Sequence, residues 1–175
     1  MESSSRQMDA LIKKAIHGNT EAYGQLIEYY KEYLYKTAFL LVNNQEQALD
    51  IVGETILRGF RFIHKVKQPN YFKTWLTKVL VNIAKDYYRK YPEMEDIDAV
   101  TVQAAIISER EISIEEKIDI NRAISLLSDK YRMVIVLKYF DELTIHEISL
   151  AMGIPEGSVK AYLHRAKAEL RKLCQ

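Results

Sequence analysis

The sequence predicts an all-α protein with two small helical domains, residues 1–91 and 113–175, joined by a flexible acidic linker, residues 92–112. The first observation is that apolar residues recur every three or four positions, the spacing of one face of an α-helix, with no sustained alternation typical of strands. The second is that this periodicity lapses from Pro92 to Ile112. The third is the distribution of charge, which separates the same three segments.

Charge changes sign along the chain. Residues 1–91 carry 14 Lys or Arg against 9 Asp or Glu, residues 92–116 carry 1 against 8, and residues 117–175 carry 10 against 7. The formal net charge of +1 therefore conceals two basic domains and an acidic connector. Basic side chains are densest between Arg58 and Lys90 and between Lys160 and Lys172. One such stripe is equally typical of a solvated helix face, whereas two in separate domains favour a polyanionic partner.

Composition excludes several classes of protein. With 48% hydrophobic residues, the 175-residue chain has enough apolar surface for a core, so it is not disordered throughout. The single cysteine, Cys174, excludes an internal disulfide and a Cys/His metal cluster around it. The longest apolar runs, such as Ala38–Val42, are too short to cross a membrane, and no secretory signal is apparent at the start. We therefore expect a cytoplasmic protein with no metal and no cofactor.

The N-terminal domain is predicted to contain four helices. A short amphipathic helix ends at Gly18, and a longer one extends from Tyr23 to Asn43. Asn44, with Gln47 three residues later, can cap the third helix. The buried face of this third helix is expected to contain Ala48, Ile51, Val52 and Phe60.

The fourth helix follows a break at Gln68-Pro69-Asn70. Its apolar face carries Phe72, Trp75, Leu76, Val79, Leu80, Ile83 and Tyr87, and it should end before Pro92. Trp75 lies on this apolar stripe, so core packing is at least as good an explanation for it as stacking on a base. Some of the clustered tyrosines Tyr29, Tyr30, Tyr33 and Tyr35 must be exposed or at an interface, because they do not fit on one face.

The linker contains at most a weak helix at Val100–Ile107. Ser113 and Glu116 form a predicted capping box that begins the second domain. Ser128 is expected to cap the next helix, which carries Met133, Val136, Leu137 and Phe140.

A helix-turn-helix pattern follows. Thr144 and Glu147 form a second capping box, Gly153 can end that helix in a left-handed conformation, and Pro155 suits the start of the next. A helix fits the DNA major groove, where Arg165 could pair with guanine and Lys160 could contact a phosphate. A helical hairpin with a solvated basic face is the alternative, which the glycine turn and the basic second helix make less favourable.

The chain resembles the extracytoplasmic-function (ECF, group IV) sigma factors of bacterial RNA polymerase over nearly its whole length, about Met8 to Leu173. Residues 144–160, T-x-x-E-I-x-x-x-M-G-I-P-x-G-S-V-K, resemble the family's region 4 helix-turn-helix. Residues 48–54, A-x-D-I-V-x-E, resemble region 2.2. Phe72-x-x-Trp75-Leu76, followed by Asn82 and Asp86, resembles regions 2.3 and 2.4. Three motifs in this order are more specific than any one of them.

This resemblance implies an alternative sigma factor that directs core polymerase to promoters and helps to open the −10 region, in a stress response. It implies polymerase contacts at Leu49, Asp50 and Glu54, although an ordinary surface pair would otherwise explain the two acids. The expected −10 residues are Lys65, Lys67, Tyr71, Lys73, Lys78, Asn82, Asp86 and Arg89. The expected −35 residues are Ser158, Lys160, Ala161, His164 and Arg165. A cognate anti-sigma factor, often membrane-anchored in this family, is a further implied partner.

Three positions depart from the family pattern. Gly53 stands where glutamine is usual, Val81 stands where an arginine often precedes the asparagine of region 2.4, and Tyr162 stands where arginine is usual. Gly53 would also weaken its helix by up to roughly 1 kcal/mol relative to alanine. These departures affect the expected promoter preferences.

Two other functions are compatible with parts of the sequence. A stand-alone helix-turn-helix regulator would explain residues 144–172 and leave the pattern in 44–90 without a role. An enzyme is disfavoured because His146-Glu147 resembles the start of an H-E-x-x-H zinc motif but position 150 is Leu150, and phosphate-binding and hydrolase motifs are lacking. The protein is therefore expected to be non-catalytic.

Overall fold

The computed structural model describes residues 2–90 and 114–173, which form helices and turns without a strand. The N-terminal bundle consists of α1 (Glu2–Ile16), α2 (Thr20–Val42), α3 (Gln45–Phe62) and α4 (Phe72–Lys90), with 3₁₀ turns at Ile63–Lys65 and Pro69–Tyr71. The C-terminal bundle consists of α5 (Ile114–Ser125), α6 (Asp129–Ile135), α7 (Ile145–Met152) and α8 (Glu156–Leu173). The predicted all-α class is confirmed. The expected helix at 100–107 and the cap at Ser113 lie outside the described residues.

Side-chain caps define the boundaries of the N-terminal helices. The Asn19 side chain accepts a hydrogen bond from the Ala22 amide at 2.8 Å, and Asn44 accepts one from the Gln47 amide at 2.9 Å. Asn43, at the end of α2, adopts the left-handed conformation with φ of 49°. The Asn43-Asn44 pair therefore ends one helix and begins the next, as the sequence predicted.

The C-terminal half of α2 is buried on all sides. Thr37, Ala38, Phe39, Leu40 and Leu41 are each at most 8% exposed. One side of this segment packs on α3 and α4, and the other packs on α5, α6 and the turn after α6. A helix that is apolar around its whole circumference is suited to a buried position between layers.

Phe60 is not buried as predicted; it is 49% exposed. The inward stripe of α3 passes through Gly59, where a Cβ atom would lie 2.4 Å from the Tyr23 hydroxyl oxygen. That hydroxyl donates to the Ile56 carbonyl at 2.7 Å, so a close approach of Tyr23 takes the interior position. Phe60 lies beside it, with its ring centroid 5.3 Å from that of Tyr23.

The segment from Met133 to Phe140 is not one regular α-helix. It is α-helical to Ile135 and continues as a π-helical turn, Val136–Phe140. Ser128 precedes α6, but its side chain makes no capping bond; its carbonyl oxygen accepts instead from the Tyr131 and Arg132 amides at 2.9 and 2.8 Å. The wide turn changes the direction of the chain and brings Asp141 toward the N-terminal bundle.

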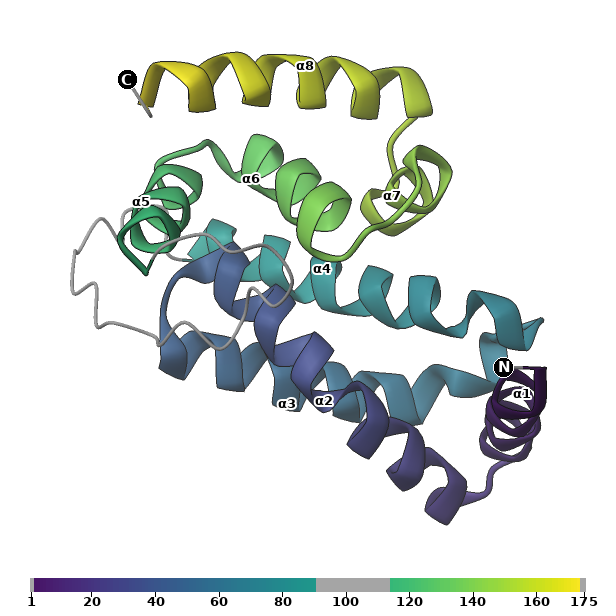
Figure 1. The fold of residues 1–175 in the computed structure, drawn as a ribbon. Helices are drawn as coiled ribbons and strands as arrows, with labels where there is room; N and C mark the ends of the chain where they lie inside the picture. Colours follow the sequence, from purple (N-terminus) through teal and green to yellow (C-terminus); the bar gives the residue numbers. More distant parts are fainter. Residues whose placement is uncertain (1, 91–113, 174–175) are drawn as a thin grey trace.

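The two bundles pack against each other. In Figure 1, α1–α4 occupy one side and α5–α8 the other, with α8 outermost. Helix α7 lies on α4, and α5 and α6 lie on the C-terminal half of α2. Among the described residues, no helix has the length and apolar character needed to span a bilayer.

Candidate nucleic-acid interface

Helices α7 and α8 form a helix-turn-helix. The Thr144 amide donates to the Glu147 carboxylate at 2.8 Å, and the Glu147 amide donates to the Thr144 hydroxyl at 3.2 Å, which is the predicted capping box. Gly153 follows α7 with φ of 67°, a conformation that favours glycine. The Ser149 hydroxyl donates to the Ile154 carbonyl at 2.6 Å and ties the turn to α7.

Helix α8 separates a buried stripe from an exposed basic face. Val159, Leu163 and Ala166 are buried against the bundle. The predicted contact residues lie outside that stripe: Lys160, Ala161, His164 and Arg165 are exposed and Ser158 is half-buried. The face that the sequence assigned to DNA is therefore free of intramolecular packing at its four central positions.

Tyr162, one of the departures from the family pattern, packs within the C-terminal bundle. Its ring meets that of Tyr131 edge-on, with centroids 5.9 Å apart, and the Lys130 ammonium lies 5.4 Å from its centroid. The side chain at this position is thus half-buried against α6, at the margin of the exposed face.

On α4, three of the expected −10 residues form one exposed row. Lys78, Asn82 and Arg89 are exposed and lie four and seven residues apart, which places them on the same face of a helix. Asp86, on the same face, is about half exposed and forms ion pairs with Arg58 at 3.9 Å and Arg89 at 3.7 Å.

The expected −10 residues around the start of α4 divide into two groups. Lys65, Lys67 and Tyr71 are exposed, whereas Lys73 is half-buried. The Lys73 ammonium lies 4.7 Å from the Tyr33 ring centroid and donates to the Asp141 carbonyl at 3.5 Å. Three of these four expected −10 residues are thus exposed, and the structure places the fourth, Lys73, at the contact between bundles.

Two apolar side chains on α4 have internal positions. Trp75 is half-buried and packs on Phe72, with ring centroids 6.1 Å apart, so core packing accounts for much of its surface. Val81 is fully buried. It lies on the same side of α4 as Thr74 and Lys85, whose polar atoms contact Glu147 and the Met152 carbonyl of α7. The valine that replaces the usual arginine therefore faces the C-terminal bundle.

An exposed face of α3 carries the predicted polymerase contacts. Leu49 is 54% exposed, and Asp50 and Glu54 lie beside it. Sequence reasoning missed Leu57, which is 64% exposed and lies two helical turns after Leu49 on the same face. Gly53 lies between them, and a Cβ added there would meet no atom within 4 Å. The signal that could have identified Leu57 is its spacing of eight residues from Leu49.

The acidic side chains of α3 are linked to α4. The Tyr87 hydroxyl donates to Asp50 at 3.2 Å, and the Arg58 guanidinium pairs with Glu54 at 2.6 Å and with Asp86 at 3.9 Å. These groups line a groove between the two helices, together with Ile83, Arg89 and Lys90. The expected polymerase face and the expected −10 face are therefore adjacent and electrostatically connected.

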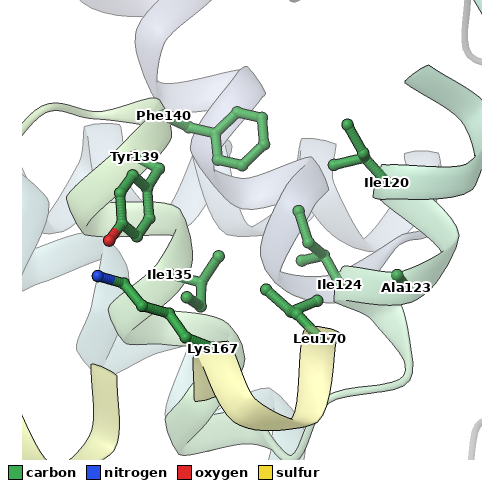
Figure 2. A pocket seen from close by; sticks show the side chains of 8 residues that line it. All are labelled: Ile120, Ala123, Ile124, Ile135, Tyr139, Phe140, Lys167 and Leu170. Carbon is green, nitrogen blue, oxygen red and sulfur yellow. The ribbon is translucent and has the colours of Figure 1, made fainter. Parts of the chain in front are cut away.

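A second groove of about 250 Å³ lies on the C-terminal bundle between α5, the π-helical turn and α8 (Figure 2). Its walls are mostly aliphatic, from Ile120, Ala123, Ile124, Ile135 and Leu170, with Phe140 at one side. Lys167 and Tyr139 supply its polar groups, with the ammonium 5.4 Å from the ring centroid. This lining suits an apolar side chain and lacks the paired acids, bases or nucleophiles of a catalytic centre.

These features together define a two-bundle helix-turn-helix protein with exposed basic faces on α4 and α8. Comparison with known families is more specific: Sigma-70 region 2 matches residues 26–91 and Sigma-70, region 4 matches residues 117–170. The chain is 32% identical to the ECF RNA polymerase sigma factor SigW of Bacillus subtilis, over 94% of this chain and 97% of the relative. It is 32% identical to RNA polymerase sigma factor SigV of the same organism, over 81% and 84% of the two chains.

Solved structures share the fold. The CnrH structure, in complex with the cytosolic domain of CnrY, has a TM-score of 0.71 at 22% identity and covers 95% of this chain and 96% of that one. The sigma factor RpoE from Bartonella quintana, in complex with the anti-sigma factor NepR, has a TM-score of 0.69 at 22% identity, covering 87% and 96%.

The chain belongs to the family of ECF RNA polymerase sigma factors. It is an alternative sigma factor that directs promoter-specific initiation of transcription, and sigma factors act by binding core RNA polymerase and promoter DNA. The match to region 2 accounts for residues that a stand-alone helix-turn-helix regulator would leave without a role. Sigma factors are a non-catalytic class of initiation factor.

Proposed function

We propose that the chain divides promoter recognition between its two domains, residues 1–91 and 113–175, joined by the acidic linker 92–112. The observation that carries this proposal is the exposed basic face of α8 beside its buried stripe. In this division, α8 binds the −35 element, the α4 face and the preceding loop bind the −10 element, and α3 docks on core polymerase.

At the −35 element, α8 enters the major groove. Arg165 presents a planar guanidinium that can donate two hydrogen bonds to guanine O6 and N7, and His164 lies next to it. Lys160 contacts phosphate, Ala161 allows close approach or meets a thymine methyl, and Ser158 bonds a phosphate near the start of the helix. The base-specific role therefore falls on Arg165 and the positioning role on Lys160 and Ser158.

At the −10 element, the task is to stabilise DNA that has lost its base pairing. An unpaired base needs a stacking surface and the displaced phosphates need cations. Tyr71 is 50% exposed and stands between the lysines of the loop and those of α4. Lys65, Lys67, Lys78 and Arg89 supply exposed cations, and Asn82 supplies an amide that can read a base edge. Lys73 adds a further cation only when its contacts with the C-terminal bundle are released. Asp86 orients Arg89 through its ion pair.

The polymerase contact combines apolar and acidic chemistry. Leu49 presents exposed aliphatic surface, and Asp50 and Glu54 flank it with carboxylates. Acids on an otherwise basic domain are suited to a basic partner surface. Leu57 extends the apolar part of this face by two helical turns.

The remaining parts of the proposal follow from family membership. The protein acts in the cytoplasm, has no catalytic activity of its own, and responds to a stress signal through an anti-sigma factor, which is membrane-anchored in many members of the family. The solved neighbours CnrH and RpoE were each determined with a partner, CnrY and the anti-sigma factor NepR, which supports a partner of this kind for the present chain.

Run-off transcription with purified core polymerase on a promoter library tests the proposal. We expect transcripts from a defined set of promoters that share −10 and −35 sequences. A gel shift without polymerase is the companion measurement. Tight, sequence-specific binding by the isolated protein at physiological salt, or no promoter-specific transcript with core polymerase, would contradict the proposal.

A further inference from the structure

A buried carboxyl group joins the two bundles. Asp141, in the loop after the π-helical turn, is 6% exposed. The Thr37 hydroxyl of α2 lies 2.8 and 3.0 Å from its two carboxylate oxygens and donates to them. The Tyr33 hydroxyl lies 3.5 Å from Oδ2. The side chain of Asp141 is thus enclosed by groups of the opposite bundle.

These contacts continue into α4. The Tyr33 hydroxyl lies 2.6 Å from the Thr77 hydroxyl, which donates to the Lys73 carbonyl at 2.8 Å. Because Thr77 donates to that carbonyl, it can accept the Tyr33 proton, which leaves the Tyr33 oxygen able to accept from Asp141. A protonated Asp141 would complete this chain by donating to Tyr33 while its other oxygen accepts from Thr37.

The environment of Asp141 favours its neutral form. Burial raises the pKa of Asp141 to about 7, against the lowering effects of the Thr37 hydrogen bond, the Lys73 ammonium and the Tyr33 hydrogen bond. The titratable groups that face it are the Tyr33 hydroxyl from α2 and Lys73 from α4; Glu147 of α7 interacts with the same Lys73. Lys73 thus acts on both Asp141 and Glu147, and its charge does not offset the loss of water around Asp141.

Two further polar contacts link the two bundles. The Leu41 carbonyl, at the end of α2, accepts from Arg132 of α6 at 2.8 Å and from Tyr88 at 2.6 Å. Arg132 also donates to the carbonyl of Ser125, the last residue of α5, and to that of Leu127 just after the helix. Lys85 of α4 donates to the Met152 carbonyl at the end of α7 at 2.7 Å. Each uses a carbonyl left free at a helix end.

In this closed arrangement, α4 and α8 lie too close together to reach the −10 and −35 elements at the same time. Helix α4 packs on α7 and α7 packs on α8, so two helix-packing distances of about 10 Å each separate the axes of α4 and α8. The −10 and −35 elements lie about 25 base pairs apart, or about 85 Å at 3.4 Å per base pair. Even with the length of the helices added, about 27 Å each, the closed protein cannot bind both elements at once.

We propose that Asp141 is an intramolecular latch that holds the free protein closed through Thr37 and Tyr33, and that this latch must open before both promoter elements can be bound. The inference rests on the proposed assignment of α4 and α8 to the two elements. The apparent promoter affinity is then the intrinsic affinity of the open form multiplied by the fraction of molecules that are open. Neither DNA-binding face is changed by the latch.

Small-angle scattering of the full chain tests the latch separately from transcription. A compact chain of this length has a radius of gyration of about 16 Å, and separation of the two halves raises it to about 20 Å or more. We expect Asp141→Lys to open the protein, because a lysine cannot be accommodated in this pocket. Asp141→Asn is the matched control: its amide can accept from Thr37 and donate to Tyr33, so it stays closed.

A second variant alters the other side of the contact. Thr37→Val with Tyr33→Phe keeps the shape of α2 and removes both hydroxyls from Asp141, so we expect it to open while circular dichroism stays unchanged. In run-off transcription at limiting protein, both opened variants should exceed wild type several-fold, and Asp141→Asn should not. If Asp141→Lys and the Thr37→Val, Tyr33→Phe double variant both keep the wild-type radius of gyration, the latch is overturned. If wild-type protein gives no promoter-specific transcript with core polymerase, only the proposed function is overturned.

Discussion

The Thr37 hydroxyl donates to the Asp141 carboxylate at 2.8 Å across 104 residues of sequence. Neither residue belongs to a DNA-binding or polymerase-binding motif. Thr37 lies in the part of α2 that is buried on all sides, and Asp141 directly follows the π-helical turn. The pair therefore connects the core of one bundle to the loop that leads into the helix-turn-helix of the other.

The stability of the closed form should depend on pH. The pKa of Asp141 is raised from 3.8 to about 7, so its favourable contribution is complete below the lower value and is lost as pH rises through the upper one. Over that range the loss is at most about 4 kcal/mol, since each pKa unit corresponds to about 1.4 kcal/mol. The melting temperature of wild type should fall between about pH 4 and pH 7 and level off above that range. Asp141→Asn should remove this dependence, and equal slopes for both proteins would contradict the assignment.

Gly59 and Gly53 should respond in opposite ways to alanine. At Gly59 a Cβ atom would lie 2.4 Å from the Tyr23 hydroxyl and 3.3 Å from Leu76, so we expect Gly59→Ala to destabilise the protein by about 1–3 kcal/mol. Gly53→Ala, with open space around the new methyl group, should stabilise α3 by roughly 0.5–1 kcal/mol. Urea unfolding measures the free energy of unfolding of both variants. A Gly53→Ala protein less stable than wild type would contradict the open space that the structure shows around this position.

Val81 should not tolerate the arginine that is common at this position in the family. Because Val81 is fully buried, Val81→Arg places a charge with no partner at the contact between bundles. We expect a loss of about 3 kcal/mol or more in the closed form, unless the protein opens to expose the new side chain. Val81→Ile is the apolar control: it adds one methylene and no charge, with an expected cost at the low end of about 1–3 kcal/mol. Small-angle scattering distinguishes separation of the two bundles from unfolding. A Val81→Arg protein that stays closed and as stable as wild type would contradict the burial of Val81 between the bundles.

Arg165 and Lys160 should affect promoter binding differently. Arg165→Ala should cost about 1–3 kcal/mol and relax selectivity at one −35 base pair, because a bidentate base contact is lost. Lys160→Ala should weaken binding to all promoters alike and lower the salt dependence by about one phosphate contact. Holoenzyme binding to a set of −35 variants measures both effects. Lys172→Ala, near the end of α8, is the control because it removes the same charge. If Arg165→Ala, Lys160→Ala and Lys172→Ala lose selectivity equally, the assigned roles are refuted.

Leu57 should contribute to polymerase binding although the sequence motif did not identify it. Leu57→Ala should weaken core binding by about 1 kcal/mol or more, comparable with Leu49→Ala, because both remove exposed aliphatic surface from one face of α3. Leu126, 63% exposed in the C-terminal bundle, provides a control of the same type. Titration of labelled core polymerase measures affinity, and wild-type affinity for Leu57→Ala would limit the docking face to the motif residues.

Much of the local structure was predictable because it depends on residues close in sequence. The Asn44 cap, the Thr144–Glu147 capping box and the left-handed Gly153 all involve contacts within three or four positions. Phe60 was wrongly assigned to the core because Tyr23, more than thirty residues away, takes the space beside Gly59. Ser128 lacks the expected capping bond, and helical periodicity does not reveal that the turn after Ile135 widens to a π-helix.

By itself, the sequence determined that this protein is helical, that its charge separates into basic domains and an acidic connector, and that it carries the motifs of an ECF sigma factor. Only the tertiary structure decided that α7 packs on α4 and that Val81, Tyr162 and Lys73 have internal partners. It also placed Asp141 against Thr37. The reason is physical: periodicity identifies the apolar face of a helix, whereas the partner of that face depends on long-range packing and on which polar groups can be satisfied together.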